Sequence, residues 1–202
     1  MHPAAPFRLT DRARLIDQLR LQPFVAVFAP TPQGLRVAHA PVVVRTLPSG
    51  VVLDFHLSKG NDLSPLFSAG AVALAVSLGP EAYISPDWYG LADQVPTWNY
   101  VSVEAEGPVS LLDQDGLIAL LDDLSAEAEA RLAPKPPWTR AKMSPDRFEA
   151  MVAGVRGFRL SPTRFEGVLK LAQNKPDAAR HGVAEALADH PIGVLMGRGA
   201  PR

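Results

Sequence analysis

The sequence predicts a mainly β protein with flanking helices, an α+β fold built around an antiparallel barrel. About six or seven short, β-branched segments follow one another in hairpin order, separated by turn residues rather than by helices. Strands joined in this way argue against a doubly wound parallel sheet, in which a helix follows each strand. The chain has 202 residues, of which 47% are hydrophobic, and is therefore long enough for one ordinary domain with a buried core.

In the first half of the chain, apolar stretches alternate with turn residues. Thr10 or Asp11 can cap an N-terminal helix that carries a mostly apolar stripe, and Pro23 ends it. The turn sequences "TPQG" and "LPSG" then separate β-branched runs, as in hairpins. We expect strands at 24–30, 35–44, 51–57, 71–79, 82–90 and 97–112, with a short helix at 61–70.

The second half of the chain is richer in helices. Residues 113–132 have the apolar spacing of an amphipathic helix, and 144–154 form a second helix with Pro145 in its first turn. A further strand pair is expected at 155–174 and a last helix at 176–191, before a Gly-rich end that should fray. We expect one domain over 1–202, with a barrel core at about 10–112 and C-terminal helices and strands at about 113–190.

Composition excludes several classes of function. There is no cysteine, so disulfides, thiolate metal sites and cysteine nucleophiles are absent. No run of eighteen apolar residues predicts a transmembrane helix, and the N-terminus does not resemble a secretory signal, so we expect a cytoplasmic protein without membrane contact. The segment from Gly79 to Ala130 carries acidic residues and no Lys or Arg. No basic arm or stripe compensates for it, so the sequence gives only weak support for DNA binding.

Familiar catalytic motifs are also absent from the sequence. No Gly-rich dinucleotide fingerprint, P-loop, zinc-protease motif or nucleophile elbow occurs. The five histidines lack the spacing of metal ligands, so no metal site is expected. A lone histidine on a strand is usually structural. No catalytic residue can be named.

Two stretches could bind an anion. In "FHLSKGNDLSPL", the N–H groups of a helix start, the Ser58 hydroxyl and the Lys59 ammonium could surround a negative group. In "KLAQNKPDAARHGV", Lys170, Gln173 and Asn174 place donors just before a helix. The structural alternatives are a plain strand-to-helix turn and a capped polar loop.

The aromatic residues are unevenly distributed. All three tyrosines and two of the three tryptophans lie between Tyr83 and Tyr100. Such clustering indicates either an aromatic wall for a planar ligand or a dense aromatic knot in the core.

The order of three motifs resembles a known family. "GPEAYISPDWYG", "VPTWNYVSVEAEG" and "LKLAQNKPDAARHGV" together resemble the FMN-binding negative transcriptional regulators, the PaiB-like proteins. "FHLSKGN" and "LRVAHAPVVV" resemble two further segments of that family, so the likeness covers about residues 1–190. Two positions depart from the family pattern: Lys59 stands where an arginine is common, and Ala172 stands where a serine is usual.

This resemblance implies a flavin split barrel, with six antiparallel strands, that forms a homodimer and holds FMN at the subunit interface. It implies a bacterial flavoprotein with a regulatory role, such as a repressor, although no clear helix-turn-helix is present. The cofactor-binding candidates are His39, Pro41, Val42, His56, Leu57, Ser58, Lys59, Asn61, Tyr83, Ser85, Trp88, Trp98, Asn99, Tyr100, Lys170, Gln173 and Asn174. One alternative is an FMN-dependent oxidoreductase of the flavin reductase or oxidase type. A second alternative is haem binding through His56.

Overall fold

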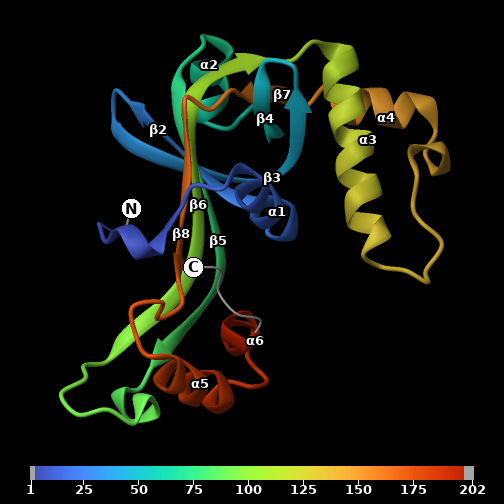
Figure 1. The fold of residues 1–202 in the computed structure, drawn as a ribbon. Helices are drawn as coiled ribbons and strands as arrows, with labels where there is room; N and C mark the ends of the chain where they lie inside the picture. Colours follow the sequence, from blue (N-terminus) through green and yellow to red (C-terminus); the bar gives the residue numbers. More distant parts are fainter. Residues whose placement is uncertain (1–2, 198–202) are drawn as a thin grey trace. The chain divides into compact units, whose positions relative to one another are not determined.

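The computed structural model describes residues 3–197, which fall into two units. The barrel unit comprises 19–77 and 104–165, and the aromatic unit comprises 1–18, 78–103 and 166–202. Two strands, β5 (Val72–Ile84) and β6 (Thr97–Leu111), continue from one unit into the other (Figure 1). Whether the chain is best counted as one domain, as the sequence predicts, remains a prediction.

Six strands close the predicted antiparallel barrel. In the order β6-β5-β2-β3-β4-β7 each strand is hydrogen-bonded to the next, and β7 pairs back with β6. The other four strands of this ring are β2 (Phe24–Thr31), β3 (Gly34–Leu47), β4 (Gly50–Ser58) and β7 (Val155–Leu160). β7 comes from the segment expected to flank the barrel core, and it completes the ring. The mainly β, split-barrel fold class is therefore confirmed.

The sheet has eight strands rather than six. β1 (Arg8–Leu9) and β8 (Arg164–Lys170) extend it beyond β6, in the order β1-β8-β6. The predicted strand at 82–90 is also wrong, because β5 runs unbroken to Ile84 and residues Pro86–Tyr89 form a 3-10 helix, η2. Pro86 favours this helix start because its first position needs no N–H donor.

The helices mostly follow the sequence pattern. They are α1 (Arg12–Leu21), α2 (Leu63–Ser68), α3 (Gln114–Ala130), α4 (Pro145–Val152), α5 (Asp177–Ala186) and α6 (Pro191–Gly197), with two further 3-10 turns, η1 (Ala5–Phe7) and η3 (Arg140–Lys142). The end that was expected to fray therefore contains α6 as far as residue 197, and residues 198–202 lie outside the described part of the chain. Within residues 3–197, no helix is long and apolar enough to span a membrane.

Three phenylalanines form the centre of the barrel-unit core. Phe55 on β4, Phe67 on α2 and Phe158 on β7 are each at most 1% exposed. Their ring centroids lie 5.6 to 5.9 Å apart in tilted and edge-to-face arrangements. Such aromatic contacts add to the free energy gained from burial itself. They fix β7 and β4, which carries the candidate residues His56, Leu57 and Ser58, against α2.

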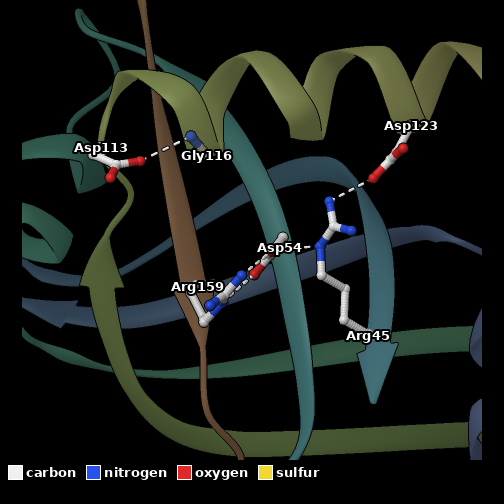
Figure 2. A network of polar contacts seen from close by, with 6 residues as sticks. All are labelled: Arg45, Asp54, Asp113, Gly116, Asp123 and Arg159. Carbon is white, nitrogen blue, oxygen red and sulfur yellow. Dashed lines mark hydrogen bonds and ion pairs between the residues drawn. The ribbon is translucent and has the colours of Figure 1, made fainter. Parts of the chain in front are cut away.

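A buried carboxylate ties the barrel strands to α3 (Figure 2). Asp54 on β4 is 1% exposed and accepts two hydrogen bonds from Arg159 on β7, both at 2.7 Å. Arg45 on β3 donates to the same carboxylate at 2.8 Å and forms an ion pair with Asp123 on α3 at 2.6 Å. Near the start of α3, the Asp113 carboxylate accepts the Gly116 N–H at 2.8 Å as an N-cap.

Candidate functional site

The structure divides the site residues predicted from sequence between the two units. The barrel unit contains His39, Pro41, Val42, His56, Leu57, Ser58, Lys59 and Asn61. The aromatic unit contains Tyr83, Ser85, Trp88, Trp98, Asn99, Tyr100, Lys170, Gln173 and Asn174. Each unit contains a cavity that is lined by some of its own candidate residues.

An apolar cavity of about 490 Å³ lies beside β3 and β4 in the barrel unit. Pro41 and His56 line it, together with side chains of α3 and α4 and with Trp138 and Met143 from the segment between those helices. The His56 Nδ1 is buried and has no hydrogen-bond partner among residues 3–197. Burial also lowers the pKa of His56, so the neutral imidazole is favoured. The cavity therefore combines an apolar wall with one uncompensated polar atom.

A second cavity, of about 430 Å³, adjoins the first. The two share Phe148, Val152 and Val155 as lining residues. Two cationic side chains, Lys59 and Arg156, line the second cavity. Two carboxylates, Asp113 and Glu149, line it as well, but Asp113 already accepts the N-cap hydrogen bond of α3.

The turn at Ser58 differs from the predicted anion cradle. The backbone N–H of Lys59 donates to the Gly154 carbonyl at 2.9 Å, and that of Gly60 donates to the Ser58 Oγ at 3.3 Å. The N–H of Leu63 donates to the Asn61 Oδ1 at 3.0 Å. These backbone donors are therefore already paired, that of Lys59 with Gly154 and the other two within the turn. The Lys59 ammonium and the proton of the Ser58 hydroxyl, whose oxygen only accepts here, remain as donors for an anion.

The other candidates of the barrel unit have simpler surroundings. His39 is exposed on β3, where its ring stacks with that of Phe24 at 6.2 Å between centroids and 16° between planes. Val42 and Leu57 are buried in the core, at 1% and 5% exposure. Their side chains pack the barrel, so only their backbone atoms could face a cofactor.

The aromatic cluster is largely a surface feature. Tyr83 and Trp98 are 47% and 52% exposed and meet edge to face, with 6.1 Å between their ring centroids. Trp88 lies half-buried in η2, which starts after Ser85, and Tyr100 is half-buried on β6. Among these aromatics only Tyr89 is fully buried. The reading as a core knot is therefore wrong for Tyr83 and Trp98, which are available to cover a ligand or another chain.

The remaining candidates of the aromatic unit differ in whether they line a cavity. Asn99, Lys170 and Asn174 all line a cavity of about 240 Å³. Gln173 does not line it: its Oε1 accepts the Leu171 N–H at 2.8 Å, and its Nε2 donates to the Leu169 carbonyl. Gln173 therefore fixes its own loop.

Sequence reasoning missed several polar residues that line these cavities, among them one cation of the barrel unit and two donors of the aromatic unit. Arg156 lines the barrel-unit cavity with Lys59, while Thr97 and Lys175 line the cavity of the aromatic unit. Lys175 directly follows Asn174 and could have been included on that ground. No group of three or more His, Asp or Glu side chains in residues 3–197 is arranged to hold a metal ion.

Solved structures share this architecture. One is the FAD and haem binding protein from Mycobacterium smegmatis, with a TM-score of 0.56 and 19% identity over 88% of this chain and 79% of the other. Another is the flavocytochrome Anf3 from Azotobacter vinelandii, with a TM-score of 0.59 and 12% identity over 84% of this chain and 72% of the other. The fold is thus that of the flavin-binding split-barrel proteins.

Sequence comparison identifies the family. The model of the "Putative FMN-binding domain" family matches residues 1–164, and this chain belongs to that family. The chain is also 29% identical to the protease synthase and sporulation protein PAI 2 of Bacillus subtilis (strain 168), over 90% of this chain and 86% of that protein. The PaiB-like resemblance drawn from the sequence motifs is confirmed.

Proposed function

We propose that this protein binds FMN in the barrel unit, between β3, β4, α3 and α4, and that the bound flavin controls a regulatory role. The observation that carries this proposal is the pair of adjoining cavities, one apolar and the other lined by Lys59 and Arg156. FMN has the matching division, with a flat, largely apolar ring system at one end and a phosphate dianion at the other. The volumes fall within the roughly 300–1,000 Å³ that small-molecule sites occupy.

The residues present fit this cofactor. The unpartnered His56 Nδ1 can accept an N–H from the polar edge of the ring when the proton lies on Nε2, and the lowered pKa favours the neutral imidazole that this requires. Lys59 and Arg156 can hold the phosphate, and the Ser58 hydroxyl beside Lys59 in sequence is a further candidate donor. One Arg156 nitrogen already donates to the Ser68 Oγ at 3.1 Å, which leaves its other donors for the phosphate. Bound FMN would supply one- or two-electron redox chemistry, which the protein's own side chains lack. Membership of the FMN-binding family supports the same cofactor.

We further propose a cytoplasmic homodimer. Tyr83 and Trp98 form an exposed aromatic pair, and Leu91 and Val95, in the segment between them in sequence, are 43% and 72% exposed. Exposed apolar patches of this kind usually mark an interface. Sedimentation at micromolar concentration should give the mass of a dimer, and a monomer that still binds FMN tightly would contradict a site shared between subunits.

The phosphate end of the site can be tested with two ligands that differ only there. Lys59→Ala should weaken FMN binding about ten- to a hundredfold, since a hydrogen bond to a charged group contributes roughly 1.5–3 kcal/mol. Riboflavin, which lacks the phosphate, should bind the variant as well as the native protein. Because Lys59 is exposed, the loss should shrink at high salt. Flavin fluorescence titrations measure all these affinities.

Matched variants complete the experiment. Lys59→Arg should restore much of the FMN affinity, because it keeps the charge. Arg36→Ala removes another exposed cation of the barrel unit, at the tip of the β2–β3 hairpin and outside both cavities, and should change neither affinity. An equal loss of FMN and riboflavin affinity in Lys59→Ala would remove Lys59 from the phosphate site. A protein that is colourless when purified and ignores added FMN would overturn the whole proposal.

A second candidate function is haem binding at the same apolar cavity. The observation that favours it is again the buried His56 Nδ1 without a partner, because a neutral imidazole nitrogen is a suitable axial ligand for haem iron. The M. smegmatis structure is described as binding both FAD and haem, and the A. vinelandii protein is described as a flavocytochrome. Haem titration should then give a Soret band that His56→Ala abolishes. A band that persists in His56→Ala would exclude this histidine as the ligand.

A further inference from the structure

The aromatic unit contains a pocket, lined by several polar side chains, that is not part of the proposed flavin site. It has a volume of about 240 Å³ and lies between β6, β8 and the loop before α5. Its polar side chains include Thr97, Asn99, Lys170 and Lys175, and its apolar wall includes Phe7 and Val95. A free water takes about 30 Å³, so the pocket has the volume of about eight waters. This is too small for a flavin.

Two ammonium groups give the pocket a positive charge. The Lys170 Nζ donates to the Thr97 Oγ1 at 2.7 Å and lies 6.0 Å from the centroid of the Phe7 ring. The Lys175 Nζ donates to the Gln94 Oε1 and lies 5.2 Å from the centroid of the Tyr89 ring. No acidic side chain lines the pocket, and neither lysine forms an ion pair within residues 3–197. Burial lowers the pKa of Lys170, and a bound anion would offset that desolvation.

Asn99 indicates that the ligand must also offer a hydrogen-bond donor. Its side chain is 0% exposed, and its Nδ2 makes only a weak contact of 3.4 Å with the Met196 Sδ. Its Oδ1 is buried and has no hydrogen-bond partner among the described residues. Buried acceptors are nearly always paired, so an orphan acceptor on a residue that lines a cavity points to a donor on a missing ligand. Sulfate has no donor to offer at neutral pH, and an ammonium group would be repelled by the two lysines.

We propose that this pocket binds a small hydroxy-carboxylate, with the carboxylate between Lys170 and Lys175 and the hydroxyl donating to the Asn99 Oδ1. The two ammonium groups neutralise the anion, the amide oxygen selects the hydroxyl, and the apolar wall accommodates a short carbon chain. The pocket is a ligand sensor separate from the flavin. Its occupancy would act directly on the segment between β8 and α5, where Ala172 holds a left-handed backbone with φ of 57°.

Isothermal titration of the full chain with lactate, propionate and sulfate tests the proposal. Propionate is lactate without its hydroxyl, so lactate should bind about tenfold more tightly, as expected for one net hydrogen bond. Sulfate, which has no donor for the Asn99 Oδ1, should bind less tightly than lactate. Absence of lactate binding, equal affinities for lactate and propionate, or tighter binding of sulfate would each overturn the assignment.

Variants separate the roles of the residues and of the two sites. Lys170→Met and Lys175→Met should each weaken both carboxylates about ten- to a hundredfold while keeping the apolar part of the side chain. Asn99→Leu should remove the preference for lactate over propionate; because Asn99 is buried, the two lysine variants keep the test decisive if this variant fails to fold. FMN affinity should be unchanged in both lysine variants. A matching loss of FMN affinity in the lysine variants would assign the pocket to the flavin site instead. Loss of lactate binding alone in these variants supports the proposal, even if the protein binds no flavin.

Discussion

Replacing Asp54 by alanine should be among the most destabilising single changes in the barrel unit. The carboxylate is 1% exposed and accepts three hydrogen bonds of 2.7 to 2.8 Å from Arg45 and Arg159. Removing one partner of a buried ion pair typically costs about 3–5 kcal/mol, because the opposite charge loses its compensation. Both arginine side chains are roughly 30% exposed, so they can recover some hydration once the carboxylate is removed. The expected loss of unfolding free energy therefore stays within that range and does not reach the higher sum of three charged hydrogen bonds.

Chemical denaturation followed by circular dichroism measures this loss, and thermal unfolding provides a second measure. A cost of 3–5 kcal/mol in a chain of this size corresponds to a decrease in Tm of roughly 6–20 °C. Asp113→Ala is the matched control: it removes an exposed carboxylate that accepts a single N-cap hydrogen bond and should cost only about 1 kcal/mol. If Asp54→Ala costs no more than this control, the network does not stabilise the barrel as argued. A double-mutant cycle with Arg159→Ala should give a coupling energy above about 1 kcal/mol.

Three further predictions concern other parts of the fold. Burial lowers the pKa of His56, so the unfolded chain binds a proton at this histidine more tightly than the folded chain does. The contribution of neutral His56 to the free energy of unfolding is therefore full above about pH 6.5 and is lost as the pH falls below that value. His56→Leu should flatten the fall in unfolding free energy between about pH 7.5 and 5. Trp98→Ala should cost less than the roughly 3–5 kcal/mol of a buried tryptophan, because Trp98 is 52% exposed, and should weaken dimerisation in sedimentation measurements. Gly107→Ala should destabilise by at least about 1–3 kcal/mol in a denaturant titration, because its Cβ would lie 2.1 Å from the Ser161 carbonyl oxygen, whereas Gly197→Ala meets no atom within 4 Å and should not.

The hairpins of the barrel could be predicted from sequence because short β-branched runs and turn residues are local signals. β1 could not, because two residues carry no periodicity. A Gly-Pro pair is typical of a turn, so the sequence predicts that one strand ends at Gly79 and the next begins at residue 82, yet β5 continues through both Gly79 and Pro80. In the structure the small size of Gly79 serves a close approach, since a Cβ there would lie 2.5 Å from the Gln18 side-chain nitrogen. Sequence alone cannot distinguish these two uses of glycine.

The candidate sites were predictable to the extent that their residues adjoin in sequence. His56 and Lys59 fall in one recognisable segment, and each lines a cavity of the barrel unit. Arg156 joins Lys59 only because β7 pairs with β4, a contact between residues about a hundred positions apart. Gln173 was included because it places a donor just before a helix, but the local loop satisfies both its polar atoms. A sequence pattern shows neither the pairing of distant strands nor the local competition for hydrogen bonds.

The interleaved order of the two units sets the sequence of events during synthesis. Every strand that closes the barrel has left the ribosome once residue 160 has emerged, whereas the aromatic unit still lacks its last segment, which begins at residue 166. Chains generally fold from the N-terminus while they are being made. The early half of β6 must therefore wait, with its edge unpaired, until β8 arrives to cover it. A nascent chain stalled between these two points would present an almost complete barrel beside an exposed strand edge, the form in which this protein is most exposed to aggregation and to chaperones.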